Sequence, residues 1–179
     1  MPPKRTAQRT SKRSCQLKRE KINITEMEIE EIINLLNSKI FTSDISSDNL
    51  RKINLSDFEQ VFLEEYQPEK SLIIYGTLAP NAPNHSVIEH IKGNWQKGII
   101  KGRLTQEGWG AELGYYGFKH ASKEEQKEIK VYILFSDELG ANWQFLDEFE
   151  GNGYKRILTK YELENGLIGV GNIYAINAE

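Results

Sequence analysis

The chain has 179 residues, of which 39% are hydrophobic and 27% are charged. This composition is typical of a globular protein with one sizeable core. The longest apolar runs, such as 131–135, fall far short of the roughly 18 residues that a membrane-spanning helix needs, and no apolar segment of a secretory signal stands at the N-terminus. Cys15 is the only cysteine, which excludes an internal disulfide and a cysteine-rich metal site. It favours a reducing compartment such as the cytoplasm.

The net charge of −3 conceals two oppositely charged parts. Residues 1–21 contain eight basic residues and one acidic residue, a net charge of +7 that leaves −10 for the remainder. Because this segment has almost no large apolar side chains, we expect a disordered tail. The tail is either a solvated segment without a specific partner, an electrostatic arm for nucleic acid or acidic surfaces, or an Arg-rich mitochondrial presequence. Translation from Met27 would leave it out.

Two helices are predicted in an extension over residues 22–69. Apolar residues recur at helical spacing over 26–40. A second helix is predicted to begin at Ser56, since Ser56 and Glu59 have the spacing of a capping box, and to end before Pro68. These helices carry no recognisable chemistry, and we expect them to pack on the following domain or on a partner.

From residue 70 to residue 179 the pattern is that of a domain rich in strands. We predict short helices over 83–91 and 136–150, and strands over 71–75, 98–104, 129–136, 156–163 and 167–176. The dipeptide Asn165-Gly166, between the last two strands, is typical of a hairpin turn. The predicted fold class is α+β, with a mainly antiparallel sheet or small barrel and helices at its sides.

The segment 145–151 contains the strongest candidate for a catalytic group. At about 100° per residue, Glu150 falls in the middle of the apolar stripe of its helix, whereas Glu148 falls on the solvent side. Gly151 is expected to end the helix. Burial and the negative end of the helix dipole both raise the pKa of a carboxyl group, which suits a general base. The alternative is a helix-end glutamate that turns to solvent or pairs with Lys155 or Arg156.

A second candidate site is the turn after the first strand, Tyr75-Gly76-Thr77-Leu78, which leads to Pro83-Asn84-His85. A glycine here lets the backbone turn sharply and exposes N–H groups that can hold a carboxylate or an oxyanion. The alternative is an ordinary turn in which His85 serves packing. The sequence has no phosphate-binding loop and no zinc motif, and its three histidines lack a metal-site spacing. We therefore expect a reaction without metal or cofactor.

Four motifs in chain order resemble the gamma-glutamylcyclotransferase-like family: Tyr75-Gly76-Thr77-Leu78, Pro83-Asn84-His85, Leu146-Asp147-Glu148-Phe149-Glu150 and Tyr154-Lys155-Arg156. They are most similar to the gamma-glutamylamine cyclotransferase branch, over about residues 70–179. The resemblance implies a small β-barrel with flanking helices and Glu150 as the acid/base. It also implies that the loop formed by Tyr75, Gly76, Thr77 and Leu78 cradles a gamma-glutamyl group. Further candidates for the pocket wall, with packing as the alternative, are Tyr116, Tyr154 and Tyr174.

The resemblance also implies an intramolecular reaction on a small gamma-glutamyl substrate. The α-amine attacks its own side-chain carbonyl and releases 5-oxoproline together with an amine, an amino acid or a peptide. Glu150 would take the ammonium proton and deliver it to the leaving nitrogen. Two other interpretations stay open: a non-catalytic module that binds an amino-acid-like ligand, and an interaction protein that acts through its N-terminal extension.

Overall fold

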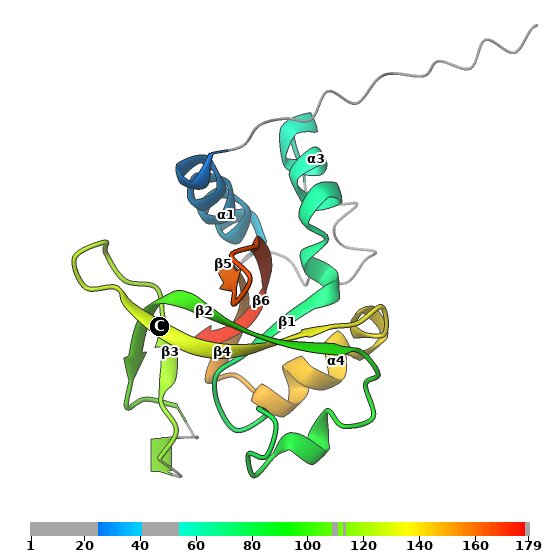
Figure 1. Ribbon diagram of the computed structural model, residues 1–179, viewed down its shortest axis with the longest axis vertical. Coiled ribbons are helices and arrows are strands. Elements are labelled where there is room, and N and C mark those ends of the chain that lie inside the picture. The colour runs from blue at the N-terminus through cyan, green and yellow to red at the C-terminus, as the bar shows by residue number, and fades with distance from the viewer. Residues whose placement is uncertain (1–24, 41–53, 109–110, 113, 178–179) are drawn as a thin grey trace, which may run out of the picture.

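The computed structural model describes residues 25–40, 54–108, 111–112 and 114–177. The predictions for the basic tail lie outside these ranges. The described helices are α1 (Glu26–Ile40), α3 (Asp57–Tyr66) and α4 (Leu139–Glu150), and they surround a β-barrel (Figure 1). None of them has the length and apolar character required to cross a membrane.

The described strands form one six-stranded sheet. They are β1 (Ser71–Ile74), β2 (Asn94–Thr105), β3 (Gly117–Lys119), β4 (Lys127–Phe135), β5 (Tyr154–Leu163) and β6 (Ile168–Ile176). The pairings β1–β4, β4–β2, β2–β5, β5–β6 and β6–β1 close five strands into a ring, and β3 bridges β2 and β6. Only the β1–β6 and β3–β6 pairs are parallel. The prediction of a mainly antiparallel α+β barrel is therefore confirmed.

The observed elements depart from the predicted ones in two places. The pattern missed β3, because three residues are too few to establish an alternation of apolar and polar side chains. The helix expected over 83–91 is only a three-residue 3-10 turn, His85–Val87. The hairpin turn is confirmed, since Gly166 has φ 80° in the connection between β5 and β6.

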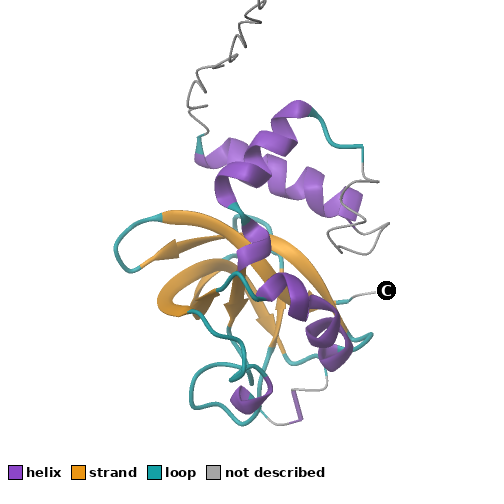
Figure 2. Ribbon diagram, turned by 90° about the vertical axis from the view of Figure 1, so that its right-hand side faces the viewer, coloured by secondary structure: helices purple, strands orange, loops and turns teal. Residues whose placement is uncertain are grey.

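Three apolar clusters hold the layers together. The barrel interior is filled by side chains that include Ile73, Ile100, Phe118, Ile133 and Ile173, none more than 2% exposed. Helix α4 covers a second cluster on one side of the barrel, and α1 and α3 cover a third on the other side (Figures 1 and 2). The N-terminal extension thus packs on the barrel, which was one of the two predicted arrangements.

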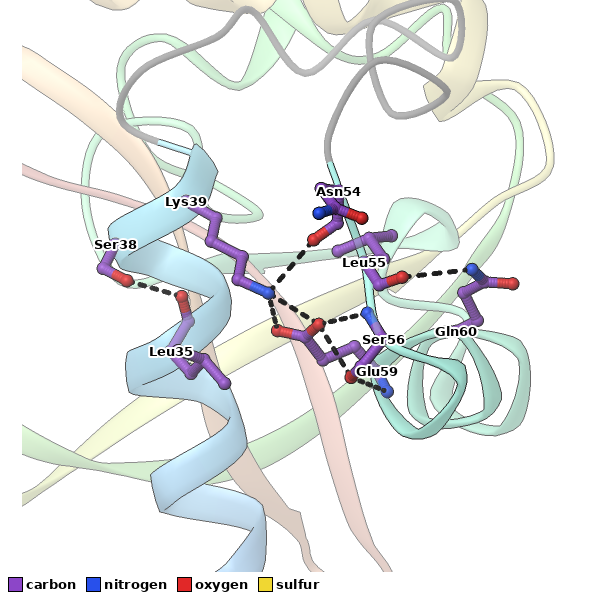
Figure 3. Close-up of polar contacts among 8 residues, drawn as sticks. All are labelled: Leu35, Ser38, Lys39, Asn54, Leu55, Ser56, Glu59 and Gln60. Atoms are coloured by element: carbon purple, nitrogen blue, oxygen red, sulfur yellow. Dashed lines mark hydrogen bonds and ion pairs between the residues drawn. The ribbon is translucent and has the colours of Figure 1, made fainter.

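Polar contacts fix the extension in place. The buried side chain of Asn37 on α1 donates to the carbonyl of Leu158 (2.9 Å) and accepts from the N–H of the same residue (2.8 Å), so it takes the place of a neighbouring strand beside β5. The predicted capping box of Ser56 and Glu59 is present at the start of α3. Glu59 also forms an ion pair with Lys39 of α1 at 2.6 Å (Figure 3).

Candidate active site

A pocket opens where β1 ends, at the C-terminal end of α4. Its empty volume is about 460 Å³, part of it open to solvent. It is lined by all the residues that the sequence singled out for the site, which are Tyr75, Gly76, Thr77, Leu78, Tyr116, Glu150, Tyr154 and Tyr174. Four further lining residues were not predicted, namely Leu72, Ile73, Ile74 and Tyr115.

Glu150 occupies the last position of α4, and the predicted helix stop is present behind it. Gly151 has φ 68°, and its N–H donates to the carbonyl of Asp147. Burial, and secondly the charge of Asp147, raise the pKa of Glu150 to about 7. No hydrogen bond or ion pair joins the Glu150 carboxylate to another residue in the part of the chain that the structure describes. The carboxyl group is therefore available to exchange a proton with a ligand near neutral pH.

Glu148, by contrast, is exposed and lies hydrogen-bonded to Gln144 along the outer face of α4. The two glutamates thus differ in exposure as the helical spacing predicts. Neither Lys155 nor Arg156 pairs with Glu150, so the alternative of a salt-bridged helix end is not what the structure shows.

The loop after β1 supplies hydrogen-bond donors. Among the described residues, no acceptor receives the backbone N–H groups of Gly76, Thr77 and Leu78, and all three residues line the pocket. The loop is held from behind, because the N–H of Asn84 donates to the carbonyl of Thr77 (3.0 Å) and Nδ1 of His85 lies 3.0 Å from the carbonyl of Leu78. A rigid loop with unused N–H groups is suited to hold a carboxylate or an oxyanion.

Gly76 has a different role from the one expected. Its φ does not lie in the left-handed region, and a Cβ built on it would meet nothing within 4 Å. Neither the backbone turn nor crowding by other residues requires a glycine here. Because Gly76 lines the pocket, an added side chain would instead take up space that is open to a ligand.

Of the five tyrosines that line the pocket, two support its wall and one lies at its rim. Tyr75 and Tyr174 are braces: the Tyr75 hydroxyl donates to the carbonyl of Tyr174 (2.7 Å) and accepts from the N–H of Phe118 (2.9 Å). Burial raises the pKa of both, so they stay neutral. Tyr116 is 44% exposed at the rim, where its hydroxyl accepts from Gln106.

The sequence did not predict the ion pair that lies beside the pocket. Arg156 binds Asp147 through two parallel hydrogen bonds of 2.9 Å each. Its guanidinium also lies over the ring of Trp143, 4.4 Å from the centroid. The pairing of Asp147 with a residue of β5 depends on how α4 packs, which no local pattern specifies. Within the described ranges, no group of three or more His, Cys, Asp or Glu side chains is placed to hold a metal ion.

Comparison with solved structures gives several similar folds. YkqA from Bacillus subtilis is 25% identical with a TM-score of 0.47; the match covers 60% of this chain and 36% of that one, about a third of its length. An AIG2-like protein from Mus musculus is 21% identical with a TM-score of 0.45, covering 62% and 78%. A gamma-glutamyl cyclotransferase specific to glutathione, from yeast, is 12% identical with a TM-score of 0.36, covering 59% and 67%.

Comparison at the sequence level gives the family. No curated protein sequence matches the chain significantly. Residues 72–178, well over half of the chain, match the family described as gamma-glutamyl cyclotransferase, AIG2-like. The matched range begins inside β1 and includes α4, the Tyr75 loop and every described residue that lines the pocket. The chain therefore belongs to the AIG2-like gamma-glutamyl cyclotransferase family.

Proposed function

We propose that the protein releases 5-oxoproline from a gamma-glutamyl amine or peptide, with Glu150 as general acid and base. The proposal depends on one observation, the environment of the Glu150 carboxyl group. Its carboxyl group lines the pocket, makes no hydrogen bond to a described residue, and has a pKa raised by burial to about 7. An ordinary glutamate, with a pKa near 4.3, is a poor base for an amine with a pKa near 8. The raised pKa of Glu150 reduces the difference between the pKa of the base and that of the substrate amine.

The reaction needs three proton transfers. The Glu150 carboxylate takes a proton from the substrate α-ammonium, and the freed amine nitrogen attacks the γ-carbonyl carbon. The new C–N bond closes a five-membered ring and leaves an oxyanion. Glu150 then gives its proton to the leaving nitrogen, the original amide C–N bond breaks, and the carbonyl re-forms. The ring nitrogen, which still carries two protons after the attack, gives one of them to the departing amine, so that the products are 5-oxoproline and an ammonium. Because both reacting groups belong to one molecule, the effective molarity can reach about 10⁵ to 10⁸ M once the substrate is folded correctly.

The N–H groups of Gly76, Thr77 and Leu78 supply the binding part of the proposal. They can hold the substrate carboxylate or the oxyanion, and one such donor to an oxyanion is typically worth about 2.7 to 4 kcal/mol. Glu150 is the only charged residue in the described lining of the pocket. A leaving group with its own carboxylate would find no cation there, which favours a gamma-glutamyl amine over a gamma-glutamyl peptide.

The test is a substrate panel with detection of 5-oxoproline by mass spectrometry. The panel contains gamma-glutamyl amines, gamma-glutamyl dipeptides and glutathione, and each is incubated with the full chain and with the Glu150→Gln variant. We expect enzyme-dependent release from a gamma-glutamyl amine, with slower release from the peptides. Binding of a gamma-glutamyl compound without any release would instead support the non-catalytic binding module.

A further inference from the structure

Asp147 is the most constrained carboxylate near the pocket. Arg156 binds it with both Nε and Nη2, and the hydroxyl of Tyr174 donates to Oδ1 at 2.7 Å. The side chain of Arg156 is only 6% exposed and lies against Trp143. A bidentate pair between a planar guanidinium and a carboxylate has a fixed geometry. The carboxylate of Asp147 therefore has a defined place relative to α4, β5 and β6.

Further hydrogen bonds connect Tyr174 to the loop after β1, whose N–H groups line the pocket. The carbonyl of Tyr174 accepts from the hydroxyl of Tyr75, which in turn accepts from the N–H of Phe118. Tyr75 directly precedes Gly76. Asp147 on α4 is thus linked through β6 to the start of the loop after β1, and Glu150 lies one helical turn beyond Asp147.

The charges around Glu150 come from few groups. The tyrosines that line the pocket with it are Tyr75, Tyr115, Tyr116, Tyr154 and Tyr174, and phenols are neutral near pH 7. Lys155 alternates to the other face of β5, where its charge contributes to a lowered pKa of His120 behind the larger effect of burial. Within the described ranges, Asp147 and its partner Arg156 are the charged groups that remain beside Glu150.

We propose that Asp147 is the positioning residue of this site: clamped by Arg156 and Tyr174, it holds the end of α4 against the Tyr75 loop and keeps Glu150 basic. The part of this role that concerns catalysis depends on the proposed function. The physical reason is that a fixed negative charge disfavours a second one nearby. Arg156 binds Asp147, and the negative charge of Asp147 raises the pKa of the nearby Glu150.

The first experiment needs no substrate. In protein labelled with ¹³C at Asp and Glu side-chain carboxyls, the titration of Glu150 is followed by NMR in the wild type, in Asp147→Asn and in Glu148→Gln. Asparagine keeps an acceptor for Tyr174 but removes the charge, so the Glu150 midpoint should fall from about 7 by about one pH unit, the scale of a charge–charge interaction near a protein surface. Glu148→Gln should leave the midpoint unchanged.

The wild type supplies a measurement that does not depend on folding of the variant. The Asp147 carboxyl resonance should show a second inflection at the Glu150 midpoint, because the two groups act on each other. An Asp147 signal without that inflection, or an Asp147→Asn variant that folds with an unmoved Glu150 midpoint, would overturn the proposal. A purely structural Asp147 would lower the melting temperature of the variant without moving the midpoint.

Activity gives an independent result once a substrate is known. In Asp147→Asn the rise of kcat with pH should move to lower pH by the same amount as the NMR midpoint. The plateau of kcat should fall by up to about tenfold because the base is weaker. If no substrate is turned over but the NMR midpoint moves, the proposed function fails and the positioning role of Asp147 stands.

Discussion

Glu150 and Glu148 are two residues apart on one helix, yet their surroundings differ. Glu150 lines the pocket with a raised pKa, whereas Glu148 is exposed. Loss of a general acid/base typically costs about 10² to 10⁴ in rate. We therefore expect Glu150→Gln to lower kcat by at least about 10² and to change KM little, because the N–H groups of the loop remain. Glu148→Gln is the matched control, and steady-state assays in which both variants keep the wild-type rate would contradict the mechanism.

The pH dependence of stability follows from the same carboxyl group. A pKa of Glu150 that is higher in the folded state than its ordinary value of 4.5 means that the folded protein binds the proton more tightly. Glu150 then weakens folding progressively as pH rises from about 4.5 to about 7. Glu150→Gln should consequently gain stability relative to the wild type across that range. Urea unfolding at pH 5 and pH 8 checks this; an equal difference at both pH values would contradict it.

Gly76 provides a third prediction at the scale of a residue. Its backbone is not left-handed and a Cβ there would meet no atom within 4 Å, so Gly76→Ala should fold with a nearly unchanged melting temperature. One added methyl group in a pocket typically changes binding by about 1 to 3 kcal/mol. We expect KM for the substrate to rise by about tenfold or more. Gly140→Ala, on the exposed first turn of α4, is the control, because its Cβ also meets nothing within 4 Å.

At the scale of elements, α1 and α3 are joined by an ion pair whose carboxylate is buried and whose lysine is partly exposed. Glu59 is 1% exposed and accepts from Lys39 and from the N–H and hydroxyl of Ser56 (Figure 3). Burial raises its pKa, but the hydrogen bonds from Lys39 and Ser56 outweigh burial and leave the pKa lowered. The free energy that this pair adds is therefore present above the ordinary pKa of about 4.5 and is lost as pH falls toward the folded value.

The Glu59→Gln variant tests that contact. Lys39 is partly exposed and keeps its hydrogen bond to the carbonyl of Asn54, so we expect the variant to lose about 1 kcal/mol of stability at pH 7. The difference from the wild type should shrink as pH falls below about 4. Denaturant unfolding at both pH values measures it, and Glu65→Gln, at an exposed position of α3, is the control. A difference that stays constant with pH would show that the charge of Glu59 contributes nothing.

For the whole molecule, the extension is a structural layer of the barrel. Ile29, Ile32, Ile33 and Leu36 of α1 are at most 6% exposed and pack against Leu158 and Val170. Burial of each such side chain contributes about 1.5 to 3 kcal/mol, and the total stability of a domain is only about 5 to 15 kcal/mol. The family match begins at residue 72, so this layer lies outside the matched range.

Two truncations compare the layer with the basic tail. A chain that begins at Ser56 loses α1 and leaves the Leu158 backbone without its Asn37 partner, so we expect it to unfold or aggregate at room temperature. A chain that begins at Thr25 loses the basic tail, residues 1–21, and three more residues but keeps α1, so its melting temperature should match that of the full chain. Circular dichroism melting distinguishes these outcomes. An α1-less chain as stable as the full chain would show that the barrel does not need the extension.

The sequence by itself determined the local features of this protein. Helical spacing predicted α1 and α4 and put Glu150 on the inner face of its helix. The Ser56 capping box and the Asn165-Gly166 turn could also be predicted, because such signals depend on residues a few positions apart. The Tyr75 loop was proposed from the glycine that follows its strand and then from a family resemblance, and the further tyrosines were added after that resemblance; the structure brings them together in one pocket. Their roles in binding and catalysis stay predictions.

Only the tertiary structure decided which separate elements of the chain contact one another. The closure of the barrel by β1 and β6, the Asn37 contact with Leu158 and the clamp of Arg156 on Asp147 depend on how packed elements are oriented. No local pattern specifies a hydrogen bond between residues about a hundred positions apart. The same holds for the open space at Gly76 and for the short strand β3, because each exists through neighbours that folding supplies and not through its own sequence.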